Sequence, residues 1–146
     1  MDFSTFNTKS AADEGAVLHF VHPILGHYLF DGKGADKDGA LVDPSADHQP
    51  VTATVRGYHS DTVQAVANNG QKARFENQSK AQQERAGRDL IDALIVDWQG
   101  ITRGGKPLPC TAENKFWLTE TNHEIFRQID QFAKDQANFF GKPGKG

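Results

Sequence analysis

The chain has 146 residues, of which 37% are hydrophobic, and its 16 basic and 19 acidic side chains leave a net charge of -3. This length allows one domain with its own core, whereas the charge balance argues against a protein that binds nucleic acid by neutralising phosphates. The single cysteine excludes an internal disulfide bond, and no apolar run approaches the roughly 18 residues that a membrane-spanning helix needs.

The N-terminal stretch 1–15 is predicted to be weakly structured, with a short helical turn that begins at Thr8 or Ser10. It lacks a basic region followed by an apolar run, which is the pattern of a secretory signal. We therefore expect a soluble protein that stays in the reducing compartment where it is made. Phe3 and Phe6 are expected to pin this arm onto the body of the protein or onto a partner.

Residues 16–30 predict a β-hairpin, because two runs rich in β-branched and aromatic residues flank a turn. In that turn Pro23 suits the second position of a type I turn, and Gly26 suits the left-handed residue that follows it. Residues 32–49 have the composition of a flexible loop. A third strand is predicted at 51–58, where apolar and polar residues alternate, so we expect a small antiparallel sheet covered on one side.

The next segments predict helices. Ser60 is expected to cap the first, and the polar stretch 68–85 predicts either an exposed helix with a break near Gly70 or a partly disordered segment. This arm, 61–85, could order when a partner binds. A helical period is clear in residues 90–98, and Gly100 is the expected stop signal.

Residues 101–110 predict a tight excursion, in which Gly104-Gly105 turns the chain and the two prolines that follow prevent a helix. Thr111 is expected to cap a helix that runs to about Leu118. Asn122 is expected to cap the last helix, which runs to about Phe139.

Together these elements predict an α+β fold, with a small N-terminal antiparallel sheet (the hairpin plus a third strand) followed by a mainly helical C-terminal part. We expect a single domain, 1–146. Its β-rich part is 1–58, its helical part is 59–140, and 141–146 is a flexible tail.

No catalytic, cofactor or metal site is predicted, so we expect a protein that is not an enzyme. His19, His22 and His27 invite a metal site, but strand parity separates His19 from His22, and no cysteine or paired carboxylate lies at zinc-like spacing. Exposed turn histidines are the favoured interpretation. Cys110 lacks a local nucleophile motif, and the glycine–lysine pairs are too short for a phosphate loop.

Short motifs that lie in order along the chain carry a family resemblance. They are Phe-Asn-Thr at 6–8, His-Pro-x-x-Gly at 22–26, Gly-Tyr-His-Ser-Asp at 57–61, Asp-Trp-Gln-Gly-Ile at 97–101, Pro-Leu-Pro-Cys-Thr-Ala-Glu-Asn at 107–114 and Asp-Gln-Ala-Asn-Phe-Phe at 135–140. With these motifs the chain resembles the tail assembly chaperones of long, non-contractile-tailed bacteriophages. It departs from their pattern at His22 and His27, where acidic or polar residues are expected, and at Cys110, where an aromatic residue is usual.

The resemblance implies a non-enzymatic protein that binds the tape-measure protein in the host cell cytoplasm before the tail tube polymerises around it. Such a chaperone keeps the tape measure soluble, helps to recruit tail-tube subunits and is absent from the finished virion. Self-association into a homo-oligomer is a further open alternative. The rival interpretation is a structural virion component, namely a tail-tube, tail-completion or neck protein, which the N-terminal sheet and the 32–49 loop would suit.

Aromatic residues are concentrated in the last third of the chain, where they offer more apolar area than two short helices need. The candidate partner-binding residues are Phe116, Trp117, Phe126, Phe132, Phe139 and Phe140. The alternative is that all six fill the core. Because Phe139 and Phe140 lie next to the tail, they are expected to be the most exposed.

Overall fold

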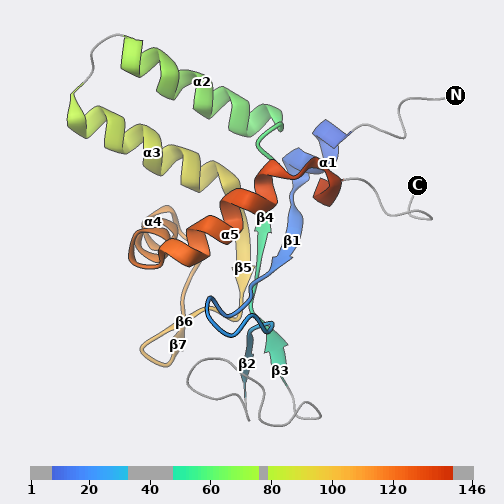
Figure 1. Ribbon diagram of the computed structural model, residues 1–146. Helices are drawn as coiled ribbons and strands as arrows, with labels where there is room; N and C mark the ends of the chain where they lie inside the picture. Colours follow the sequence, from blue (N-terminus) through green and yellow to red (C-terminus); the bar gives the residue numbers. More distant parts are fainter. Residues whose placement is uncertain (1–7, 33–47, 76–78, 140–146) are drawn as a thin grey trace, which may run out of the picture.

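A computed structural model of the chain describes residues 8–32, 48–75 and 79–139. Helices α2 (Asp61–Phe75) and α3 (Lys80–Leu94) form an antiparallel pair that projects from the upper end of a small sheet, and α5 (His123–Lys134) crosses in front of the strands (Figure 1). Helices and an antiparallel sheet occupy separate parts of the molecule, so the predicted α+β class is confirmed.

The main sheet is antiparallel and has the strand order β1-β4-β5. Its strands are β1 (Ala16–His19), β4 (Thr52–Val55) and β5 (Ile95–Gln99). Leu18 pairs with Ala53, and Ala53 pairs with Trp98 on its other side. The sheet therefore combines the N-terminal part of the chain with a strand from the part that was predicted to be helical.

The predicted helix over 90–98 is wrong in its second half. Helix α3 ends at Leu94, and Ile95 already has extended backbone angles, with φ -99° and ψ 115°. The apolar spacing fits a helix, but Ile95 is β-branched, pairs with Val55 and is almost fully buried. Pairing with β4 therefore overrides the local helical period.

The predicted hairpin over 16–30 is only partly formed. Its two arms share one isolated bridge, between Val21 and Tyr28, and β1 takes β4 as its strand partner instead. The second arm continues as β2 (Phe30–Gly32), which pairs with β3 (His48–Pro50) in a separate ribbon. Residues 33–47, which hold most of the predicted loop, lie outside the described residues.

Helix α1 (Thr8–Glu14) begins at one of the two predicted residues and is tied to the start of α2. Asp13 Oδ1 accepts hydrogen bonds from the backbone N–H and the hydroxyl of Thr62, and Ser60 Oγ accepts one from Val63 N at 3.2 Å. The predicted cap at Ser60 is thus confirmed. Phe3 and Phe6 lie outside the described residues.

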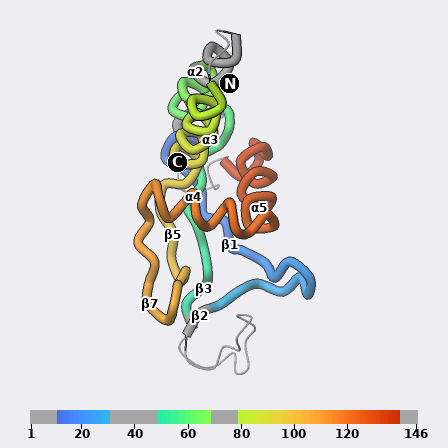
Figure 2. The backbone as a smooth tube through the Cα atoms, turned by 90° about the vertical axis from the view of Figure 1, so that its left-hand side faces the viewer, coloured from blue at the N-terminus to red at the C-terminus, as the bar shows by residue number. Residues whose placement is uncertain are grey.

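The polar stretch 68–85 is largely helical in the described backbone, where it forms the end of α2 and the start of α3. Helix α2 continues through Gly70 to Phe75, so the predicted break near Gly70 is wrong. Helix α3 begins with a capping box, in which Ser79 Oγ accepts from Gln82 N and the Gln82 side chain accepts from Ser79 N. Packing of α2 against α3 supports both helices along their length (Figures 1 and 2).

The predicted glycine turn and the cap of α4 (Ala112–Thr121) are confirmed. Strands β6 (Thr102–Arg103) and β7 (Lys106–Pro107) form a two-stranded ribbon around Gly104-Gly105, which has φ values of 61° and 79°. Thr111 Oγ1 accepts from Asn114 N at 3.2 Å. Local turn and cap chemistry therefore determines this segment.

Asn122 holds the N-cap position of α5 that was predicted for it, but its side chain does not cap this helix. Its side chain donates to Leu118 O at 3.1 Å, so it closes the end of α4 and makes no cap hydrogen bond to α5. Helix α5 also ends earlier than predicted, at Lys134. Asp135 then has extended backbone angles and accepts from Ala137 N, and the chain continues as a 3-10 turn, η2 (Gln136–Phe139).

The core lies between the sheet and the helices that cover one of its faces, and α5 is the main cover (Figure 2). Gln128 of α5 is buried and makes two 3.0 Å hydrogen bonds with Val21, accepting from its N–H and donating to its C=O. The buried hydrophobic residues come from both halves of the chain: Phe20, Ala53, Val55, Val63, Ala93, Leu94, Ile95, Ile129 and Ala133.

The lowered pKa values of two structural carboxyl groups, those of Asp13 and Asp130, predict that the protein loses stability in acid. Hydrogen bonds from the Thr62 side chain and backbone hold the pKa of Asp13 below its ordinary value of 3.8. Burial raises the pKa of Asp130, but hydrogen bonds from Lys134 and Tyr58 outweigh burial, so this pKa is also lowered. Both groups bind protons less readily in the folded state, so their stabilisation is complete above the ordinary value and is lost as pH falls through the lowered pKa values.

Thermal melting at a series of pH values should therefore show a fall in melting temperature that sets in below about pH 4. The variant Asp13→Asn/Asp130→Asn should show a smaller fall than the wild type, because it has no carboxyl group to protonate at either position. The control is Glu84→Gln, which removes an exposed carboxyl group on α3. Equal acid sensitivity in the double variant and the wild type would contradict the assignment.

Candidate functional site

Helices α3 and α4 border an open groove of about 640 Å³, which we call the α3–α4 groove. Phe116 and Trp117, two of the predicted partner-binding residues, lie on this groove. Its lining residues are Arg85, Arg88, Asp89, Asp92, Ala112, Glu113, Phe116, Trp117 and Glu120. Apolar rings among charged side chains are typical of a surface that recognises another protein rather than of a catalytic cleft.

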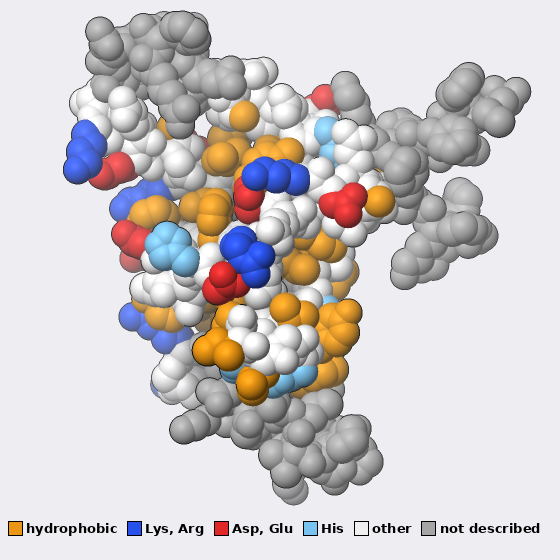
Figure 3. Space-filling model, viewed as in Figure 1, with side chains coloured by type: hydrophobic (Ala, Val, Ile, Leu, Met, Phe, Trp, Pro, Cys, Tyr) orange, Lys and Arg blue, Asp and Glu red, His pale blue; other side chains and the backbone are white. Residues whose placement is uncertain are grey.

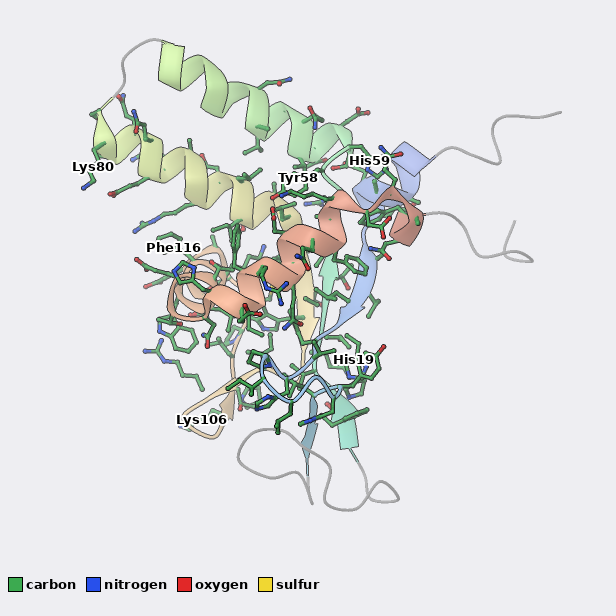
Figure 4. All side chains as sticks on the ribbon, viewed as in Figure 1. His19, Tyr58, His59, Lys80, Lys106 and Phe116 are labelled. Carbon is green, nitrogen blue, oxygen red and sulfur yellow. The ribbon has the colours of Figure 1, made fainter. Side chains whose placement is uncertain are left out.

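Both aromatic rings of the α3–α4 groove are only partly buried, and each has a cation over its face. The guanidinium of Arg88 lies 4.0 Å from the centre of the Phe116 ring, and that of Arg103 lies 4.0 Å from the Trp117 ring. Figure 4 shows Phe116 between α3 and α4. The rings are thus held in place, yet part of their surface remains open to a partner.

An ion pair between a buried lysine and a half-exposed aspartate joins the two walls of the groove. Lys115 of α4 is buried, and its Nζ contacts Asp92 Oδ1 at 2.9 Å and Asp92 O at 3.2 Å. Lys115 and Asp92 therefore have most of their charge compensated locally. Asp89, Glu113 and Glu120 also line the groove, but none of them has an ion-pair partner among the described residues.

The other predicted aromatic residues that the structure describes lie elsewhere and do not extend this surface. Phe126 faces the interior, where it lines a small void with Ile91, Leu94, Ile95, Thr119 and Ile129. Phe132 and Phe139 line a separate pocket of about 370 Å³ beside α1 and β1. The five described members of the predicted set are thus divided among three places, and Phe116 and Trp117 are the two that lie on the α3–α4 groove.

The expectation that Phe139 is among the most exposed aromatics is wrong. Its side chain is only 2% exposed, and its ring makes edge-to-face contacts with Phe132 and His59. The cause is the turn η2, which folds back toward α5, where Asn138 Nδ2 donates to Phe132 O at 3.0 Å. Phe140 and the predicted tail at 141–146 lie outside the described residues.

Among the described residues, three of the four most exposed large apolar side chains belong to a turn that sequence reasoning did not select as a binding surface; the fourth is Val17 of β1. Ile24 is 86% exposed, Leu25 65% and Tyr28 58%. We call residues 22–28 the finger, because this segment projects beyond the strands (Figure 2). In the space-filling view, hydrophobic side chains gather beside histidines on the lower part of the surface (Figure 3). Figure 1, which has the same orientation, draws this turn in that place. The sequence feature that could have revealed this surface is the pair of aliphatic residues, Ile24 and Leu25, between Pro23 and Gly26.

The finger is held rigidly by hydrogen bonds that converge on His22. His22 N donates to His27 O at 2.8 Å, and Gly26 N donates to His22 O at 3.0 Å. His22 Nδ1 accepts from Ile24 N at 3.2 Å and from Leu25 N at 3.0 Å. Gly26 has the left-handed φ of 76° that the turn requires. Little conformational entropy is therefore lost if the finger binds a partner.

The three clustered histidines have different surroundings. His19 Nε2 is 2.8 Å from Leu29 O, and its ring stacks on Tyr28 at a centroid distance of 4.6 Å. His22 and His27 stack on each other at 5.2 Å, and His22 Nδ1 is already occupied by the turn. Within the described ranges, no group of three or more histidine, cysteine, aspartate or glutamate residues could hold a metal ion.

Cys110 is half-buried, and burial raises the pKa of its thiol, an effect to which Asp97 and Asp92 add while Lys115 opposes it. Because the thiolate is the nucleophile, a raised pKa leaves this residue poorly reactive. We expect Ellman's reagent to modify Cys110 more slowly in the native protein than in guanidinium chloride at the same mildly alkaline pH. Equal rates in the two conditions would show that the thiol is not shielded from the reagent and that its pKa is not raised by the fold.

Comparison of the chain with protein-family models, with curated proteins and with solved structures found no match. In the part of the chain that the structure describes, no helix has both the length and the apolar character needed to cross a membrane.

Proposed function

We propose that this protein is a tail assembly chaperone of a long, non-contractile-tailed bacteriophage, and that it binds a helical segment of the tape-measure protein before the tail tube forms. The observation that carries the proposal is the α3–α4 groove, in which Phe116 and Trp117 offer partly open rings between two helical walls. The order of the sequence motifs from Phe-Asn-Thr to the Asp-Gln-Ala-Asn-Phe-Phe segment supports the same function.

The groove suits a helical client for physical reasons. An amphipathic helix binds by placing its apolar face into a hydrophobic groove, and aromatic side chains supply much of the binding energy at such interfaces. The walls are already paired by Lys115 and Asp92, so the groove is formed before the client arrives. A preformed groove lowers the cost of binding and favours a soluble complex.

Co-expression with the tape-measure protein of the same gene cluster tests the proposal. The chaperone should raise the amount of soluble tape-measure protein and should co-purify with it. The variant Trp117→Ala should reduce both effects, whereas Tyr28→Ala, which removes an exposed aromatic ring outside the groove, should leave them unchanged. A wild-type protein that neither solubilises nor retains the tape measure would refute this function.

A second candidate is a structural virion component, and the finger favours it. An exposed, rigid apolar turn is a costly feature for a protein that stays free, because it promotes association with other surfaces. In a tail-tube, tail-completion or neck protein the finger would be buried permanently against a neighbouring subunit. In a chaperone the same finger would instead bind tail-tube subunits during recruitment.

Mass spectrometry of purified virions discriminates between the two candidates. Several copies of this protein in each particle would support the structural component, whereas its absence from particles that contain the tape measure would support the chaperone. Ile24→Ser should not change the fold, because the side chain is mostly in solvent. If the finger is permanently buried in virions, this variant should reduce the yield of complete tails.

A further inference from the structure

From the hydrogen bonds at the base of the finger, we infer that His22 is a pH-sensitive latch, which holds the finger in one conformation at neutral pH and releases it in mild acid. The inference concerns the regulation of the finger, so it does not depend on which of the two candidate functions is correct.

The latch is the imidazole ring of His22, whose Nδ1 accepts two backbone hydrogen bonds. The donors are Ile24 N at 3.2 Å and Leu25 N at 3.0 Å. A ring nitrogen that accepts carries no proton, so the neutral ring has its proton on Nε2. The side chain thus acts like the Asn and Asp side chains that stabilise turns by accepting from backbone N–H groups a few residues ahead.

Protonation of His22 is incompatible with this hydrogen bonding, because both nitrogens of an imidazolium ring are donors. Nδ1–H would then face the N–H groups of Ile24 and Leu25, which brings three donors together without an acceptor. Both hydrogen bonds are exposed, so water can take over the two amides once the ring turns away. Release therefore needs only a local rearrangement of the turn.

The ring of His27 makes the closed finger more sensitive to protons. It stacks on His22 with ring centroids 5.2 Å apart. Its Nε2 is buried and has no hydrogen-bond partner among the described residues. A proton on this nitrogen would have no acceptor in the closed finger, and two charged rings at this distance would repel each other. Both rings therefore fit the closed finger only while they are neutral.

The surroundings of the finger do not offset this effect. The finger contacts α5 through the uncharged Gln128, and the charged side chains of α5 around it pair with one another, Arg127 with Glu124 and Lys134 with Asp130. On the side of β1, the titratable neighbours are His19 and Tyr28, which stack on each other. In the described part of the chain, no carboxylate forms an ion pair with His22 or His27.

Release of the latch changes what the finger presents to a partner. In the closed finger the exposed side chains of Ile24 and Leu25 have fixed positions, so a partner meets a preformed apolar tip. The open finger must be ordered again on binding, which weakens the complex. Because the open finger binds protons more readily, closure is favoured at neutral pH and is lost as pH falls through the interval in which histidines change charge.

Nuclear magnetic resonance of the full chain tests the latch directly. At about pH 8 the ring nitrogen shifts of His22 should show an unprotonated Nδ1. Between about pH 8 and about pH 5, the protection of the Ile24 and Leu25 amides against hydrogen exchange should fall about tenfold, after correction for the intrinsic pH dependence of exchange. Both values lie above about pH 4, where the acid loss of stability sets in, and circular dichroism would verify that the fold is retained.

Three variants locate the effect at His22. His22→Asn supplies a side-chain oxygen that can accept from the same amides and does not titrate, so protection should stay high at both pH values. His22→Ala supplies no acceptor, so protection should be low at both. The control His123→Asn removes an exposed histidine at the start of α5 and should respond to pH like the wild type.

The inference is overturned if Nδ1 of His22 carries a proton at about pH 8, or if the two amides keep their protection in the wild type at about pH 5. It is also overturned if His22→Asn loses as much protection as the wild type on acidification. The first two readouts use the wild-type chain, so the test does not depend on the folding of any variant.

Discussion

Replacing Phe139 with alanine is expected to lower the free energy of unfolding by about 3–5 kcal/mol, the range typical of a buried phenylalanine that leaves a cavity. The ring is almost fully enclosed and packs against Phe132 and His59, so neighbouring side chains cannot easily close the space. Urea denaturation followed by circular dichroism would measure the change.

The matched control is Phe116→Ala. This ring is only partly buried and borders an open groove, so its removal should cost about 1 kcal/mol and should mainly reduce partner binding. The two phenylalanines thus separate a structural role from a binding role. If Phe139→Ala kept the stability of the wild type and lost the partner, Phe139 would belong to the binding surface after all.

Replacing Gln128 with leucine should lower the free energy of unfolding by about 1–3 kcal/mol, although leucine keeps similar volume at this buried position. The substitution removes both hydrogen bonds to Val21 and leaves its N–H and C=O without their protein partner. Because Val21 stands at the base of the finger, hydrogen exchange of the backbone amides in residues 20–28 should also become faster.

Gln131→Leu is the control for this prediction, since Gln131 is exposed on the same helix and accepts one surface hydrogen bond, from Arg127. It should change stability by no more than about 0.5 kcal/mol. Equal stability of the two variants would mean that water replaces the Gln128 amide without cost. Denaturation with urea and exchange measured by mass spectrometry provide the two readouts.

The α+β class and several element ends could be predicted because they depend on chemistry within a few residues. Ser60 and Thr111 cap helices through hydrogen bonds to residues three positions ahead, and Gly104-Gly105 permits a turn that other residues resist. Interactions of this range are present in the sequence itself. Asn122 could not be predicted in this way, because its side chain can hydrogen-bond either to the end of α4 or to the start of α5. In the structure it donates to Leu118 O of α4.

The candidate site could be predicted only in part. Sequence reasoning selected Phe116 and Trp117, which share the α3–α4 groove, but it grouped them with Phe126, Phe132 and Phe139, whose positions depend on distant contacts. It did not select the finger, because exposure of Ile24 and Leu25 depends on whether any other element covers the turn. Nor could it place Asp89 of α3 and Glu113 of α4 around one groove.

The sequence by itself thus determined the α+β class, the helix caps at Ser60 and Thr111 and the glycine turn, since each follows from local backbone preference or from alternation of polar and apolar residues. Tertiary structure alone decided that residues 95–99 form a strand, that Phe139 is buried and that the carboxylates of α3 and α4 face a common groove. The physical reason is that strand pairing and burial depend on partners far along the chain, and their free energy exceeds the small local preference for helix at Ile95.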